Sequence, residues 1–233
     1  MVDWLHASLN GYFGDAAMDV PAGISFCIMI PIDVVKDVGI MDPCFGRGYC
    51  EETDWSLRSL AKGYRICLAP GSFVFHHGRG SNLDAGIVSP NATTVPGNEA
   101  IIDLRYPQFR QQVDGFIHSG ILARAHEDAL SQIVRCAASQ FGYTLETGAP
   151  DAKEEDKVRV FLSPNGYTSS AQVAFRGFRI DIPFDPANPT GSISSYFTRE
   201  PSLINIFDQQ AIAGSKESLS AGRRTVRNYP SFI

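Results

Sequence analysis

Hydrophobic and polar residues alternate in short blocks over the first third of the chain, and the blocks predict strands around one amphipathic helix. Ile24–Ile30 is a continuous apolar run of strand length, which predicts a strand buried on both faces. Glu51–Lys62 predicts a helix, because apolar residues recur at i, i+3, i+4 and i+7, and Gly63 is placed to end it. These apolar residues are Leu57, Leu60, Ala61 and Tyr64. Three shorter elements are also expected: a helix over Asp33–Val38, and strands over Arg65–Leu68 and Ser72–His77.

The middle of the chain is dominated by helical patterns. Ala123–Phe141 is the longest amphipathic segment, and its apolar positions fall on one face. That face carries Leu130, Ile133, Val134 and Ala137. Two shorter helices are expected over Glu99–Arg105 and Gln108–Ile117, with Pro107 near the start of the second.

The last third is expected to be rich in strands. Phe178–Phe184 alternates apolar and polar residues with a period of two, which is typical of a strand with one buried face. The polar stretch Gly148–Lys157 is the best candidate for a linker, and the chain from Ala213 onward is expected to be loose. Further strands are expected over Val158–Leu162, Gln172–Phe175 and Ser194–Thr198.

These patterns together predict a mixed α/β protein in three parts. Residues 1–82 form the first part, residues 83–147 a helical extension, and residues 148–233 a β-rich region with a loose tail. The chain of 233 residues is long enough for one large domain or two small ones.

The composition is that of an ordinary globular protein, and it narrows the range of partners. Hydrophobic residues make up 44% of the chain and charged residues 19%, which excludes a disordered chain. The formal net charge of −5 and the lack of a basic stripe argue against a nucleic-acid partner. No apolar stretch has the length of about 20 residues that a membrane-spanning helix needs. We therefore expect a cytoplasmic protein, at most peripheral to the inner face of the membrane.

The five cysteines form an odd set without C-x-x-C spacing, and most of them stand among apolar neighbours. Free, buried thiols in a reducing compartment are the simplest interpretation. A zinc site built from Cys44, Cys50 and either His76 or His77 is the alternative.

Three carboxylates cluster where the helix over Glu51–Lys62 is expected to begin. Glu51, Glu52 and Asp54 would face the free N–H groups and the partial positive charge of a helix N-terminus, both of which favour ionised carboxylates. A general base in this position would be charged at neutral pH. The alternative is an ordinary acidic helix start, with Asp54 paired to Arg58 four residues on.

Two histidines follow the apolar run Phe73–Phe75 and precede a glycine-rich stretch. A histidine at the end of a strand can point into a cleft and bind a metal ion through a neutral imidazole nitrogen. The alternative for His76 and His77 is a partly buried imidazole whose hydrogen bonds are satisfied within the fold.

The order of these segments resembles the acceptor-side half of family 2 glycosyltransferases, which have the GT-A fold. The matching residues are Val20-Pro21-Ala22-Gly23, Cys27, Val38–Asp42, Phe45–Trp55, Arg58, Gly63-Tyr64-Arg65, Phe73–His76 and Ser81. Each segment is unspecific alone, whereas the ordered set with this spacing is specific. The resemblance covers residues 15–82, and Leu104–Pro107 with the helices after it is similar to an extension that such enzymes often carry.

The resemblance implies an inverting displacement that moves a sugar from a nucleotide-sugar donor to a hydroxyl of a glycan or lipid-linked acceptor. Glu52 takes the position of the family's catalytic base, where many members have Asp, and Glu51 and Asp54 would support and orient it. His76 takes the position of a histidine that helps to hold a divalent cation, Mn²⁺ or Mg²⁺, on the donor diphosphate. The positions expected to contact substrate are Asp42, Gly48, Tyr49, Trp55, His77 and Ser81.

The sequence departs from the family in the donor half. No D-x-D motif for the metal and nucleotide occurs in it, and about 20 residues before the matching region are too few for two βαβ units. We therefore expect a fragment that is inactive alone and whose exposed sheet edge favours self-association. A non-catalytic glycan-binding or assembly module derived from a glycosyltransferase is the alternative function.

Overall fold

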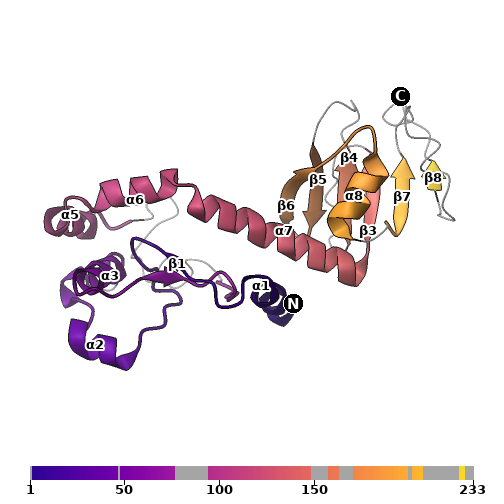
Figure 1. Ribbon diagram of the computed structural model, residues 1–233. Coiled ribbons are helices and arrows are strands. Elements are labelled where there is room, and N and C mark those ends of the chain that lie inside the picture. The colour runs from indigo at the N-terminus through magenta and orange to yellow at the C-terminus, as the bar shows by residue number, and fades with distance from the viewer. Residues whose placement is uncertain are drawn as a thin grey trace. The chain divides into compact units, whose positions relative to one another are not determined.

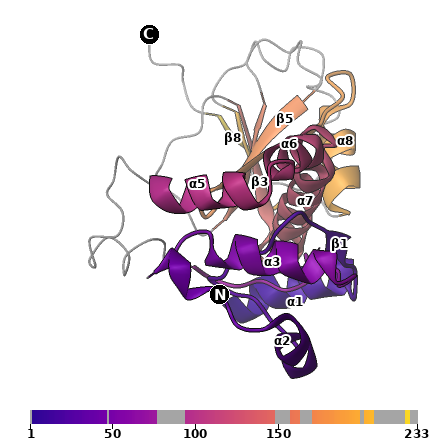
Figure 2. The same cartoon turned by 90° about the vertical axis from the view of Figure 1, so that its left-hand side faces the viewer.

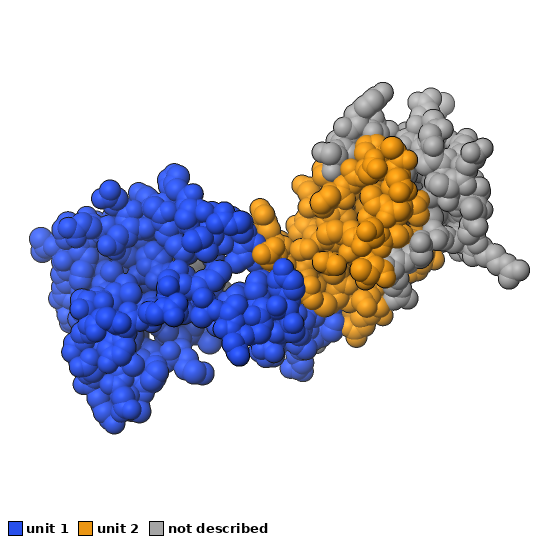
Figure 3. All heavy atoms as spheres, in the orientation of Figure 1, with its two compact units in different colours: residues 1–125 blue, residues 126–233 orange. Residues whose placement is uncertain are grey.

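The structure is a computed structural model with mixed α/β architecture (Figures 1 and 2). It describes residues 2–46, 48–76, 94–147, 157–162, 170–198, 201–206 and 226–228. The chain divides into two compact units, Met1–Ala125 and His126–Ile233, which are taken in turn below (Figure 3). The mixed α/β class predicted from the sequence is confirmed.

Unit 1 consists of short helices and a two-stranded sheet. In the sheet, β1 (Met18–Asp19) pairs antiparallel with β2 (Cys67–Leu68). A longer helix, α7 (Ile121–Phe141), begins in this unit and continues into the next. Four helices follow the predicted ranges to within three residues: α2 (Ile32–Val38), α3 (Glu51–Ala61), α5 (Pro96–Arg105) and α6 (Phe109–His118). Three elements of this unit were not predicted, namely α1 (Val2–Phe13), β1 and the short 3-10 helix η1 (Pro43–Phe45).

A small hydrophobic core anchors α3 in unit 1. Trp55 is 3% exposed and packs with Val38 and Ile66, and its indole Nε1 donates a hydrogen bond of 2.8 Å to the carbonyl oxygen of Gly39. Gly39 ends α2 with a φ of 89°, a conformation that glycine adopts without strain. The buried tryptophan thus ties the middle of α3 to the end of α2.

The buried face of α3 differs from the predicted apolar stripe. Leu57 is buried, but Leu60 and Ala61 are exposed. Ser56 is fully buried instead, because its hydroxyl accepts a hydrogen bond of 3.0 Å from the backbone N–H of Gly23. A small polar side chain whose hydrogen bond is satisfied can therefore be buried, even where the pattern of apolar residues predicts that other positions of the helix face the core.

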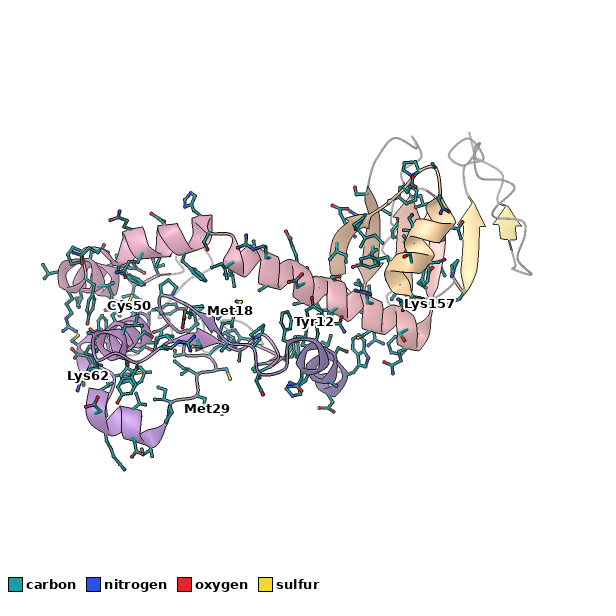
Figure 4. All side chains as sticks on the ribbon, in the orientation of Figure 1. Tyr12, Met18, Met29, Cys50, Lys62 and Lys157 are labelled. Carbon is teal, nitrogen blue, oxygen red and sulfur yellow. The ribbon has the colours of Figure 1, made fainter. Side chains whose placement is uncertain are left out.

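The expected strand over Ile24–Ile30 is wrong, because these residues form irregular backbone. Met29, on the segment between β1 and α2, is 95% exposed, and Phe26 is 52% exposed (Figure 4). A strand needs a neighbour for its N–H and C=O groups, and β1 and β2 pair only with each other in the described part of this unit. The expected strand over Ser72–His77 is likewise irregular as far as His76, and His77 lies outside the described residues.

Unit 2 is built on a six-stranded mixed sheet in the order β6-β5-β4-β3-β7-β8. β3 lies parallel to both β4 and β7, β8 lies parallel to β7, and β4, β5 and β6 form an antiparallel meander. The strands are β3 (Tyr143–Thr147), β4 (Val158–Leu162), β5 (Ser170–Phe175), β6 (Phe178–Pro183), β7 (Leu203–Ile206) and β8 (Val226–Asn228). The predicted strands over 158–162, 172–175 and 178–184 are confirmed, whereas β8 falls in the tail that was expected to be loose.

Helices α7 and α8 (Pro189–Phe197) cover the same face of this sheet (Figures 1 and 2). The α7 residues on that side are buried, in agreement with the predicted apolar face: Ile133, Val134 and Ala137. Phe197 of α8 packs its ring against Tyr143 of β3, with ring centroids 4.6 Å apart. The core of unit 2 therefore lies between one sheet face and two helices.

The strand expected over Ser194–Thr198 is wrong, since these residues end α8. The Asn188 side chain accepts a hydrogen bond from the backbone N–H of Gly191, and Pro189 stands at the first helical position. An asparagine cap followed by proline is a helix start signal, and it outweighs the β-branched and aromatic residues that suggested a strand.

Candidate functional site

The backbone turns sharply in front of α3. Gly48, Tyr49 and Cys50 all have positive φ angles, of 139°, 70° and 77°. Left-handed backbone costs an L-residue such as Tyr49 or Cys50 about 1–2 kcal/mol, and such strain persists only where surrounding contacts hold it. Two of the predicted substrate-contacting residues, Gly48 and Tyr49, thus lie in a strained turn directly before the predicted base.

Asn98 of α5 holds this turn in place. Its side-chain Nδ2 donates to the carbonyl oxygens of Phe45, Gly48 and Tyr49, at 2.9, 3.1 and 2.8 Å. The side chain is buried, so each of these contacts is protected from water. Asn98 was not among the predicted site residues. Its place in the first turn of a helix was nevertheless a signal, because asparagine side chains near helix starts often form hydrogen bonds with backbone groups.

Glu51 and Glu52 begin α3 as predicted, and both side chains are half-buried. The Glu51 carboxyl and the backbone of Ser25 lie close enough to the Glu52 carboxyl to shift its pKa. The Oε2 atom of each glutamate is shielded from solvent and has no hydrogen-bond partner among the described residues. Two adjacent carboxyls with unpaired oxygens favour a shared proton.

Burial is the largest cause that raises the pKa of Glu52 above its ordinary value of 4.5, and the neighbouring Glu51 raises it further. Hydrogen bonds from the backbone of Glu52 itself and of Ser25 act in the opposite direction without cancelling the rise. A carboxyl with a raised pKa is a better proton acceptor at neutral pH than an ordinary glutamate, which is the property that a general base needs.

Glu51→Gln is expected to lower the pKa of Glu52, because the substitution removes the like charge while it keeps the shape of the side chain. The pKa should stay above 4.5, since burial remains. NMR titration of the Glu52 carboxyl carbon measures this change. Glu127→Gln, at an exposed position of α7, is the matched control and should leave the titration unchanged; an unaltered Glu52 pKa in Glu51→Gln would contradict the coupling.

Asp54 points away from the two glutamates and is completely buried. Its carboxylate accepts hydrogen bonds from Arg58 Nε, Arg105 Nη1 and the Tyr106 hydroxyl, each at 2.8 Å. Burial alone would raise the pKa of Asp54, but these three donors outweigh it and the pKa is lowered. The i, i+4 pair of Asp54 with Arg58 is confirmed, and the network gives Asp54 a structural role that links α3 to α5.

Asp42 shares a partner with this network. Its carboxylate accepts from the backbone N–H of Cys44 at 2.9 Å and forms an ion pair of 2.9 Å with Arg105. The Cys44 N–H and then Arg105 hold the pKa of Asp42 below its usual value. Trp55 is enclosed in the core described above, so any effect of Trp55 on a bound substrate would be exerted through the shape of the turn.

His76 is exposed and stacks on the ring of Phe26, with centroids 4.5 Å apart and planes 9° from parallel. His76 therefore packs on a segment that also passes α3, since the backbone N–H of Gly23 in the same stretch donates to Ser56 of that helix. His77 and Ser81, the two remaining predicted contacts, lie outside the described residues.

No set of three or more His, Cys, Asp or Glu side chains close enough to hold an ion occurs in the described ranges. For the zinc alternative, burial raises the pKa of Cys50 to about 12, with the charges of Glu99 and Glu52 adding to the effect. This thiol is therefore protonated at neutral pH, whereas zinc binds the thiolate.

All five cysteines are free. Cys27, Cys44 and Cys67 are exposed, and Cys50 and Cys136 are half-buried, so the expectation of buried thiols is wrong. Apolar sequence neighbours did not bury the thiols: Phe45 and Ile66 are buried although Cys44 and Cys67 beside them are exposed.

No helix within the described ranges is both long and apolar enough to cross a membrane. Comparisons with protein-family models, with curated proteins and with solved structures gave no match.

Proposed function

We propose that the chain carries the acceptor side of an inverting glycosyltransferase of the GT-A type, with Glu52 as the general base. The observation that supports this most is the environment of Glu52. Its carboxyl is half-buried at the N-terminus of α3 and has a pKa that burial and the neighbouring Glu51 raise.

In the proposed reaction, Glu52 accepts the proton of an acceptor hydroxyl as that oxygen attacks the anomeric carbon of the donor sugar. Burial and, after it, the neighbouring Glu51 keep the pKa of Glu52 raised. Asp54, with its three donors, fixes the first turn of α3 against α5 and so orients the base without contacting substrate.

A divalent cation would stabilise the negative charge of the departing nucleotide diphosphate. His76 fits a single-ligand role, because stacking uses the face of its ring and leaves both nitrogens at the edge. Mg²⁺ sites on phosphates commonly take only one or two protein ligands, with water and phosphate oxygens as the rest. Donor binding needs further residues, since the sequence has no D-x-D motif.

The test is a transfer assay on two proteins, this chain alone and the product of the complete open reading frame that contains it. Each is incubated with labelled nucleotide sugars, Mn²⁺ or Mg²⁺ and a panel of glycan and lipid-linked acceptors. Labelled product is expected from the complete product, and removal of the metal by a chelator should abolish it. Lack of transfer from every donor with the complete protein would contradict the proposed function.

A further inference from the structure

Strand β6 forms one edge of the unit 2 sheet, because it pairs only with β5 in the described part of the chain (Figure 1). An edge strand presents a row of N–H and C=O groups that can pair with another strand. Arg176 and Gly177, with φ angles of 44° and 84°, form a two-residue hairpin loop between β5 and β6. The residues that flank such a loop, here Phe175 and Phe178, form a hydrogen-bonded pair, and hydrogen-bonded pairs then alternate along the ladder.

The backbone that β6 turns outward belongs to two residues of opposite charge. The alternation directs the main-chain groups of every second residue, beginning with Phe178, at β5, so those of Arg179 and Asp181 are directed away from it. Both of these side chains are exposed, and neither forms an ion pair within the described ranges. Pro183 has no N–H, so a ladder built on this edge would end there.

The two faces of β6 differ in character. Phe178 stands opposite Phe175 of β5, whose ring stacks on Phe141 of α7 with centroids 6.1 Å apart. Ile180 alternates onto this same face, which the helices cover. Both Phe178 and Ile180 are only half-buried, since none of the described strands lies beyond them. The charged residues of β6 point to the opposite face.

We propose that two copies of this chain associate through β6, in an antiparallel pair centred on Ile180 that makes the two sheets continuous. A twofold axis at Ile180 places Arg179 opposite Asp181 of the partner subunit, and symmetry repeats the contact. Arg179 and Asp181 are the residues whose main-chain groups face outward, so each of these pairs also exchanges two backbone hydrogen bonds. The edge is therefore complementary to itself in charge and in hydrogen bonding.

The apolar face is complementary in the same register. Ile180 meets Ile180 of the partner subunit as a non-hydrogen-bonded pair, the kind whose side chains lie closest together. Phe178 meets Ile182 of the partner subunit, so both half-buried side chains of β6 gain an apolar neighbour. Centring the pair one residue away in either direction would place two arginines or two aspartates opposite each other, so charge selects the register.

The test is the oligomeric state of the purified chain, measured by sedimentation velocity over a range of concentrations. The wild type is expected to show a monomer–dimer equilibrium. Arg179→Asp and Asp181→Arg should each weaken dimerisation about tenfold or more, because each places like charges opposite each other twice. An equimolar mixture of the two variants should recover the dimer, since opposite charges then meet again. Asp128→Arg, at an exposed position of α7, makes the same change in net charge as Asp181→Arg and should leave the dimer unchanged.

Hydrogen exchange followed by NMR identifies the strand that pairs. The amides of Arg179 and Asp181 should exchange more slowly in the dimer than in the dilute monomer, whereas the amide of Ile180, which faces β5, should change less. A chain that stays monomeric at every concentration would overturn the proposal. So would a dimer that Arg179→Asp leaves equally tight, or a mixture of the two variants that does not reassociate. Circular dichroism verifies the fold of each variant, and these measurements need neither donor nor acceptor, so they are independent of the proposed function.

Discussion

Glu52→Gln is expected to reduce sugar transfer by about 10²- to 10⁴-fold in the protein that shows activity, which is the usual contribution of a general base. Glutamine has nearly the shape of glutamate, so the start of α3 should be retained. It cannot take a proton from an acceptor hydroxyl. The measurement is kcat/KM for transfer at saturating metal, with kcat and KM for the acceptor determined separately.

The affinity for the nucleotide sugar distinguishes a base from a donor-binding residue. Because the base acts on the acceptor, calorimetry should give nearly the same donor affinity for Glu52→Gln and for the wild type. Glu127→Gln, at an exposed position outside the site, serves as the control for loss of one carboxylate. A large drop in donor affinity with Glu52→Gln would show that the residue has another role.

Asp54→Ala is expected to destabilise unit 1 by about 2–4 kcal/mol. The substitution removes the acceptor of three hydrogen bonds at 2.8 Å, two of them from guanidinium groups, and hydrogen bonds to charged groups contribute about 1.5–3 kcal/mol each. The estimate is below their sum because Arg58 and Arg105 are 29% and 38% exposed, so water would solvate part of the charge left behind.

Urea denaturation followed by circular dichroism measures the loss of stability, and Asp33→Ala is the matched control. Asp33 forms an ion pair with Lys36 on the surface, where its side chain is 87% exposed, so its loss should change stability by less than about 0.5 kcal/mol. Equal effects of the two substitutions would show that the Asp54 network does not hold the unit together.

The pH dependence gives an independent check on Asp54. Its pKa in the folded state lies below the ordinary value of 3.8, so its contribution is complete at pH above 3.8. That contribution is lost as the pH falls through the lower, folded-state pKa. The difference in stability between wild type and Asp54→Ala should therefore be constant near neutral pH and shrink in acid below 3.8.

The helices were the part of the fold that the sequence revealed best. The periodic apolar face of α7 acts locally, within a few residues, so the pattern contains the information. The start of α5 was predicted at Glu99, three residues after its actual start at Pro96. The strand over Ile24–Ile30 failed because an apolar run of seven residues does not say which backbone it would pair with. The helix α8 was missed because composition was weighed above the Asn188–Pro189 start signal.

Some features of the candidate site could likewise be predicted from the sequence, and others could not. That Glu51 and Glu52 begin a helix was predictable from nearby residues. That Asp54 would be bound by Arg105 and Tyr106, about fifty residues further along the chain, was not, because a sequence pattern carries no information on which distant side chains meet. The stacking of His76 on Phe26 is hidden for the same reason, although both residues stand in segments that drew attention separately.

Asn98 makes the turn before α3 sensitive to deamidation. Its amide nitrogen has two hydrogens and faces three carbonyl oxygens, which share them. Deamidation would convert this nitrogen into a carboxylate oxygen, and three attractive contacts would become repulsive ones. The strained Tyr49–Cys50 turn would then lose the group that restrains it, so ageing of a single amide would disorganise the approach to Glu52 while leaving every residue of the acidic pair intact.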